Sequence, residues 1–186
     1  MPSIAQFRET VPDSNKDYNG YDGFLVAFLY KAKQARMVDN FLSAPALSGI
    51  ADQDKDNHCQ ILLANMTLDI PRRRGDMAEA HRQHYLEIQL DKFAPETLFH
   101  ARWAQIPCFV FFDSFASPYQ RIYALKTTPE PNIADTIRTI SEACNQVWTP
   151  RAPNADPDSI RNHRKSKITE LAPHLAGITT LMRADD

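Results

Sequence analysis

Three cysteines, Cys59, Cys108 and Cys144, are the strongest nucleophiles in this 186-residue chain. No two of them have the spacing of a redox pair, so the sequence holds no dithiol motif. Cys108 stands out because it directly follows Ile106-Pro107 and opens an apolar run. A thiol at such a position is either a reactive nucleophile or a small hydrophobic side chain of the core. The second case is commoner, and we retain Cys108 as the one candidate catalytic residue.

Two histidines, His81 and His84, lie one turn apart in a segment with helical periodicity. Imidazoles at this spacing can share a metal ion. A metal site needs further ligands, and the other histidines and carboxylates are scattered along the chain. We therefore expect ordinary surface or core histidines, no bound metal and no cofactor.

Two groups of basic residues could together bind an anion: Lys31, Lys33, Arg36, Arg72, Arg73 and Arg74. The first three begin a predicted helix, and helix N-termini attract anions. No glycine-rich phosphate loop accompanies them. Ordinary solvated charge is the preferred interpretation, and a small phosphate-bearing or nucleotide-like ligand is the alternative.

The densest basic run is Arg161-Asn162-His163-Arg164-Lys165-Ser166-Lys167. Such a run can contact the phosphates of a nucleic acid or an acidic protein. Aromatic residues for base stacking are absent nearby, and acidic residues flank the run. The formal net charge of −2 also creates no field that would attract nucleic acid. We predict a solvated helix face and no nucleic-acid partner.

The composition is that of a globular domain, with 43% hydrophobic and 24% charged residues. No uninterrupted apolar run approaches the roughly 20 residues that span a bilayer. The first residues lack the basic and apolar regions of a signal peptide. Three unclustered cysteines indicate a reducing compartment. We therefore expect no membrane association and a cytoplasmic location.

Apolar patterning predicts four strands, at 24–30, 59–66, 108–113 and 119–126. Helical spacing predicts helices at 32–43, at 133–147 with Asn132 as N-cap, and from 158 to about 171. The strand–helix–strand order of the first half favours a parallel pair of strands. The five-residue connection between the last two strands favours an antiparallel hairpin.

The same patterning predicts one principal domain with two appendages. A polar N-terminal arm covers residues 1–22. The α/β domain covers residues 23–149 and contains a helical insertion at 72–105. Residues 150–186 are predicted to form a proline-rich linker and a C-terminal helical extension.

The succession of these elements resembles the thioredoxin-like fold over about residues 24 to 147. In that family a cis-proline precedes the third core strand, and Pro107 occupies the corresponding place as a structural residue. The resemblance implies a three-layer α/β/α arrangement around a central mixed sheet of about four strands, followed by the helical extension. Redox members of the family carry Cys-x-x-Cys between the first strand and the first helix. Residues 29–36 contain no cysteine here, so the resemblance implies a fold that has lost disulfide exchange.

Three functions are compatible with these features. The preferred one is a non-redox thioredoxin-like adaptor that binds a protein partner in a larger assembly. The residues around the hairpin (Trp103, Asp113, Tyr119 and Tyr123) are either a partner-binding surface or part of the core. The second is an α/β enzyme or sensor of an anionic or nucleotide-like ligand held by the basic residues named above. The third is a single-cysteine thiol enzyme using Cys108. No catalytic motif is recognisable, which favours a non-enzymatic role.

Overall fold

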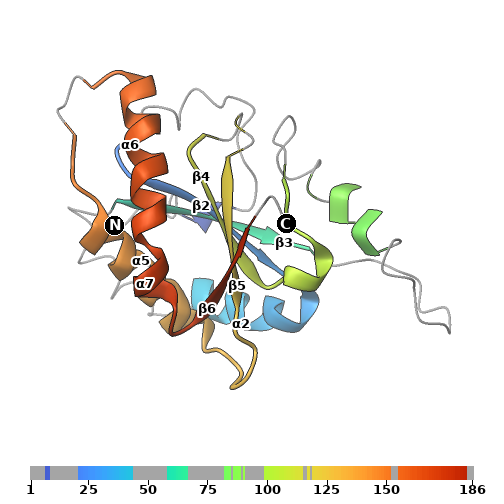
Figure 1. The fold of residues 1–186 in the computed structure, drawn as a ribbon. Helices are drawn as coiled ribbons and strands as arrows, with labels where there is room; N and C mark the ends of the chain where they lie inside the picture. Colours follow the sequence, from blue (N-terminus) through green and yellow to red (C-terminus); the bar gives the residue numbers. More distant parts are fainter. Residues whose placement is uncertain are drawn as a thin grey trace, which may run out of the picture.

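The computed structural model describes residues 7–8, 21–43, 58–66, 82–84, 86–88, 90, 99–114, 117, 119–151 and 155–183. Its centre is a six-stranded mixed sheet with the order β1-β3-β2-β4-β5-β6 (Figure 1). The strands are β1 (Phe7–Arg8), β2 (Phe24–Tyr30), β3 (Cys59–Asn65), β4 (Cys108–Phe112), β5 (Gln120–Leu125) and β6 (Thr179–Arg183). The helices are α2 (Ala32–Ser43), α5 (Ile133–Val147), α6 (Pro157–Glu170) and α7 (Ala172–Leu175), with a 3₁₀ turn, η3 (Trp103–Gln105).

All four predicted strands are present, and their pairing follows the prediction. β2 and β3 are parallel, and β4 and β5 form an antiparallel hairpin. β2 also pairs antiparallel with β4, which places it in the middle of the sheet. The predicted count of about four strands was too low, because β1 and β6 extend the sheet at its two edges.

The core lies on both faces of the sheet, and the seven residues of β2 divide between the two faces. The even-numbered residues belong to one buried cluster, to which the helices contribute Val38, Ile137, Ile140, Ile168 and Leu175. The odd-numbered residues belong to a second cluster, which includes Leu86, Leu90, Ala101 and Ile106. A strand buried on both faces needs a continuous apolar run, and the sequence of β2 is such a run.

Helix α5 forms as its sequence predicts. The Asn132 side chain accepts hydrogen bonds from the backbone N–H groups of Ala134 and Asp135, at 3.0 and 3.3 Å. These bonds satisfy two donors that a helix start leaves unpaired. The apolar residues at helical spacing, among them Ile137, Ile140 and Cys144, are buried against the sheet.

The segment between β3 and β4 is only partly helical in the described residues. Residues 82–84, 86–88 and 90 are helical, as expected for the insertion. Residues 99–102 at the end of the predicted insertion are not helical, and residues 103–105 form the 3₁₀ turn η3; residues 91–98 lie outside the described part. The Ile106–Pro107 peptide bond is cis, and so is Thr128–Pro129.

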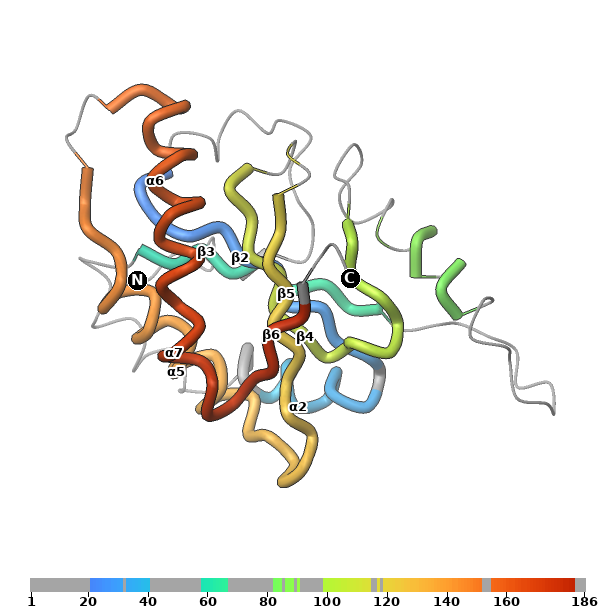
Figure 2. Tube along the Cα trace, in the orientation of Figure 1, coloured from blue at the N-terminus to red at the C-terminus, as the bar shows by residue number. Residues whose placement is uncertain are grey.

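The C-terminal segment contributes to the same core and the same sheet. Ile168 of α6 and Leu175 of α7 are fully buried, and β6 pairs antiparallel with β5. Helix α6 lies beside the start of β2 (Figure 2). The predicted C-terminal helical extension therefore contains a strand as well as helices, because its last described residues form the edge strand β6. No helix in the described residues is both long and apolar enough to cross a bilayer.

Candidate functional site

The corner where β2 leads into α2 lies next to Pro107. Lys31 is the single residue between the strand and the helix, and its backbone N–H donates to Gln34 Oε1 at 3.2 Å. Its ammonium nitrogen lies 4.2 Å from the centroid of the Trp103 ring. Trp103 is held in turn by its backbone N–H, which donates to Gln83 Oε1 at 3.0 Å. A half-buried cation–π contact of this kind contributes about 0.5–1 kcal/mol.

Cys108 is adjacent to this corner but points into the core. It is fully buried and pairs across the sheet with Leu29 and Ala124. Burial raises the pKa of its thiol to about 12, and the nearby charge of Lys31 offsets only part of that shift. A thiol with this pKa is protonated at neutral pH, whereas nucleophilic attack requires the thiolate. The structure thus gives Cys108 the environment of a core side chain.

The other two cysteines come together in the fold. Cys144 of α5 is hydrogen-bonded to Cys59 of β3, and burial together with this contact raises the pKa of its thiol. The neighbouring residues confirm the approach of helix to strand, because the His58 backbone N–H donates to Asn145 Oδ1 at 2.8 Å. Sequence spacing could not indicate this pair, since β3 and α5 are far apart in the chain.

The predicted basic patch is not assembled among the described residues. Lys33 is 3.6 Å from Glu130, and both side chains are exposed. Arg36 is exposed on the next turn of α2. The other three predicted residues, Arg72, Arg73 and Arg74, lie outside the described part of the chain.

The predicted histidine pair is likewise only half described. His84 is exposed, and His81 lies outside the described residues. Among the residues that the structure describes, no group of three or more histidine, cysteine or carboxylate side chains could hold a metal ion.

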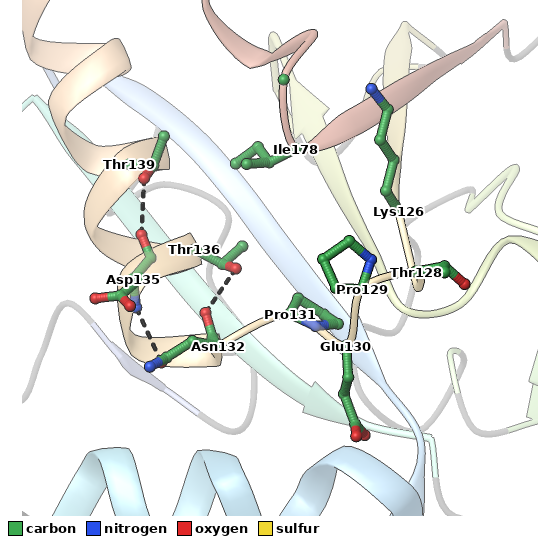
Figure 3. A pocket seen from close by; sticks show the side chains of 11 residues that line it. Lys126, Thr128, Pro129, Glu130, Pro131, Asn132, Asp135, Thr136, Thr139 and Ile178 are labelled. Atoms are coloured by element: carbon green, nitrogen blue, oxygen red, sulfur yellow. Dashed lines mark hydrogen bonds between the residues drawn. The ribbon is translucent and has the colours of Figure 1, made fainter.

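A pocket of about 310 Å³ lies between the loop after β5, the first turns of α5 and the turn before β6 (Figure 3). It is lined by Lys126, Thr128, Pro129, Glu130, Pro131, Asn132, Asp135, Thr136, Thr139, Gly177 and Ile178. Its volume is at the small end of the range for ligand pockets. The sequence gives no sign of this pocket, because residues 126–139 and residues 177–178 that line it are far apart in the chain.

Most polar groups around this pocket already have partners within the protein. The Thr136 hydroxyl donates to the backbone carbonyl of Asn132 at 2.7 Å, and the Thr139 hydroxyl donates to that of Asp135 at 2.8 Å (Figure 3). Lys126 Nζ donates to the carbonyl of Ala176 at 2.6 Å. Asp135 pairs with Arg138 at 3.1 Å. The pocket therefore presents prolines and Ile178 rather than free cations, and it suits a small apolar group better than an anion.

Two arginines of the basic run in α6, Arg161 and Arg164, form hydrogen bonds within the protein. Arg164 is fully buried, and its guanidinium donates to the carbonyls of Tyr21, Gly23 and Asp113. Burial lowers the pKa of Arg164 to about 10, so it stays charged at neutral pH. Arg161 donates from Nε to the buried Asp113 carboxylate at 2.9 Å. The prediction of a solvated helix face is thus wrong for Arg164, which binds the backbone just before β2 and just after β4.

The aromatic residues of the hairpin divide between core and surface. Tyr123 is buried, its hydroxyl donates to the Ile168 carbonyl at 3.2 Å, and burial raises its pKa to about 12. Tyr119 is half-buried, with the Arg121 guanidinium 4.9 Å and the Lys165 ammonium 4.6 Å from its ring centroid. Of the three aromatic residues that the sequence assigned to the hairpin surface, Tyr123 is therefore buried, whereas Trp103 and Tyr119 are half-buried and accessible.

Comparison with known proteins identifies no relative: no protein-family model, no curated protein and no solved structure matches the chain. Its function must be inferred from its own residues. Of the residues that the sequence singles out, the structure brings together Lys31, Trp103 and Pro107 at one corner of the sheet.

Proposed function

We propose that the chain is a non-redox thioredoxin-like module that binds a protein partner. The parallel β2–β3 pair, the antiparallel pairing of β2 with β4 and the antiparallel β4–β5 hairpin support the thioredoxin-like part of the proposal. The corner between β2 and α2, where a redox member would hold its two cysteines, has Lys31 packed on Trp103 instead. This contact is the observation that carries the proposal.

The proposed binding surface consists of Lys31, Arg102, Trp103 and Ala104, and we name it the Lys31–Trp103 surface. Arg102 and Ala104 are exposed, and the other two side chains are half-buried. Tryptophan and arginine are enriched among the residues that dominate protein–protein affinity. A surface tryptophan that is already fixed by neighbouring groups loses little side-chain entropy when a partner binds.

The proposal is tested in two steps with the full chain. Chemical crosslinking and co-purification from the native extract first identify the partner. The dissociation constant of the purified pair is then measured for the wild type, for Trp103→Ala and for a matched control, Tyr119→Ala. Tyr119 is also a half-buried aromatic residue with cationic neighbours, but it lies away from the Lys31–Trp103 surface.

We expect Trp103→Ala to weaken binding by at least about tenfold, because truncation of a central interface aromatic costs about 2 kcal/mol or more. The control should bind like the wild type, and both variants should keep the wild-type melting temperature within a few degrees. Equal affinity for Trp103→Ala and the wild type contradicts the assigned surface. Absence of any protein partner in the native extract contradicts the function.

Deleting residues 150–186 is not a suitable test of partner binding, because the deletion removes the buried Arg164 and the strand β6.

The anionic-ligand alternative has less support among the described residues. Lys33 is engaged with Glu130, and the nearby pocket carries the carboxylates of Glu130 and Asp135. Negative charge at both places opposes the binding of a phosphate. The thiol-enzyme alternative has less support again, because Cys108 is buried and protonated.

A further inference from the structure

Two of the three cysteines meet in the folded chain. Cys59 is the first residue of β3, Cys144 lies near the C-terminal end of α5, and their side chains are hydrogen-bonded to each other. The residues next to them fix this approach, because the His58 backbone N–H donates to Asn145 Oδ1 at 2.8 Å. The fold itself therefore holds the two sulfur atoms in contact.

The sheet separates this pair from the third cysteine. Cys59 and Cys144 belong to the buried cluster on the face that α5 covers, whereas Cys108 belongs to the cluster on the opposite face. Cysteines whose side chains point apart cannot be bridged without movement of the backbone. Three cysteines allow three pairings in the unfolded chain, and the fold leaves one of them open.

We propose that Cys59 and Cys144 form a site of reversible oxidation, at which a peroxide converts the two thiols into a disulfide that joins β3 to α5. Cys59 is 2% exposed and Cys144 is fully buried, so the peroxide reaches Cys59 first. The Cys59 sulfur attacks one peroxide oxygen. An S–O bond forms, the O–O bond breaks, and the leaving hydroxide takes up the proton of the Cys59 thiol to give water.

The Cys144 sulfur completes the reaction on the sulfenic acid of Cys59. The S–S bond forms, the S–O bond breaks, and the leaving hydroxide departs with the Cys144 proton as a second molecule of water. The two thiols lose two electrons, and the peroxide gains them. A small thiol reverses the bond by thiol–disulfide exchange.

Burial controls the rate of this oxidation rather than the choice of partners. The pKa of the Cys144 thiol is raised by burial and by its contact with Cys59, and the reactive form of a thiol is the thiolate. Oxidation therefore proceeds when the end of α5 opens locally, and it is slower than that of an exposed thiol. The site responds to sustained rather than brief exposure to peroxide.

The first test treats the reduced full chain with hydrogen peroxide, alkylates the remaining thiols in denaturant and maps the peptides by mass spectrometry without reduction. We expect one linked pair of peptides, containing Cys59 and Cys144, and an alkylated Cys108. Dithiothreitol should restore three free thiols. A bond that includes Cys108 overturns the proposal. So does a chain in which Cys59 and Cys144 stay thiols, or become sulfinic acids with no bond between them.

The same treatment in concentrated urea shows whether the fold selects the pair. Loop closure costs less entropy for a shorter loop, so the unfolded chain favours the bond between Cys108 and Cys144 over the longer loop from Cys59. We expect bonds to Cys108 in urea and the Cys59–Cys144 bond alone in buffer. The same distribution of bonds under both conditions overturns the proposal.

Variants assign the two steps, and the melting temperature gives a readout that needs no variant. Cys108→Ala is the matched control and should form the bond at the wild-type rate. Cys144→Ser should stop at the sulfenic acid of Cys59, which dimedone traps, and absence of this adduct overturns the assigned order. The oxidised wild type should melt at a higher temperature than the reduced form, because the bond constrains the unfolded chain. A lower melting temperature overturns the claim that the native packing accommodates the bond.

Discussion

Arg164 of α6 donates a hydrogen bond from Nε to the carbonyl oxygen of Gly23, at 2.7 Å, just before β2 begins. The same guanidinium also donates to the carbonyls of Tyr21 and Asp113. One buried side chain thereby satisfies backbone acceptors at the start of β2 and at the end of β4. The contact joins the C-terminal helix to the central strand of the sheet.

Replacing Arg164 with alanine should strongly destabilise the protein. The substitution leaves the carbonyls of Gly23 and Asp113, whose bonds are buried, and the carbonyl of Tyr21, whose bond is partly buried, without their donor. We expect a loss of about 3–5 kcal/mol in the free energy of unfolding. Arg164→Lys should also destabilise, because an ammonium cannot reproduce the fork of donors. The measurement is urea denaturation. The exposed Arg138→Ala serves as control, and its effect should stay within about 0.5 kcal/mol. A change of similar size for Arg138→Ala and Arg164→Ala would contradict this role.

Two glycines should respond differently to alanine. A Cβ on Gly23 would lie 2.5 Å from Cε1 of Tyr21 and 2.6 Å from the backbone oxygen of His58. The His58 oxygen cannot yield easily, because it accepts the Phe24 N–H at 2.7 Å. We expect Gly23→Ala to cost about 1–3 kcal/mol. At Gly177 a Cβ meets no atom within 4 Å, so Gly177→Ala should be neutral or slightly stabilising. Thermal denaturation compares the melting temperatures of the two variants. A Gly23→Ala variant as stable as the wild type would contradict the expected steric clash with Tyr21 and His58.

Cys108 should not react with iodoacetamide in the folded protein at neutral pH. Its thiol is buried, and its pKa is raised to about 12. Peptide mass spectrometry should find alkylation of Cys108 only after denaturation. Rapid labelling of this residue in the native state, at the rate of the unfolded chain, would restore the thiol-enzyme hypothesis.

The same pKa shift predicts a loss of stability at alkaline pH. The folded state keeps the Cys108 proton up to about pH 12, whereas the unfolded thiol releases it near its ordinary pKa of 9.0. The stabilisation is therefore complete below pH 9 and declines between pH 9 and 12, by up to about 1.4 kcal/mol per pH unit. Cys108→Ala should reduce this slope of the unfolding free energy against pH. An unchanged slope in the variant would assign the effect to other buried groups.

Nucleotides and inorganic phosphate should leave the melting temperature unchanged. Lys33 is paired with Glu130, and the acidic groups around the pocket repel anions. The measurement is a thermal-shift series at increasing ligand concentration. A saturable rise in melting temperature for the wild type that disappears in a Lys33→Ala, Arg36→Ala double variant would instead establish an anion site at the start of α2.

Local patterns in the sequence were sufficient to predict most helices and strands, but not the edge strand β6. The apolar run of β2 and the stripe and cap of α5 act over a few residues, so the prediction of both elements is confirmed. β6 was missed because five residues with weak patterning become a strand only by pairing with β5. The last residues of the predicted helical insertion, 103–105, form a 3₁₀ turn rather than an α-helix, and local preference in so short a segment is weak.

The candidate site shows the same division between local and tertiary information. The order of residues alone establishes that no cysteine pair follows the first strand and that Pro107 stands before an apolar segment. The packing of Lys31 on Trp103, the burial of Cys108 in the core and the bonds from Arg164 to three carbonyls become visible only in the fold. Burial and charge environment depend on residues that are distant in the chain, and no local pattern encodes those residues.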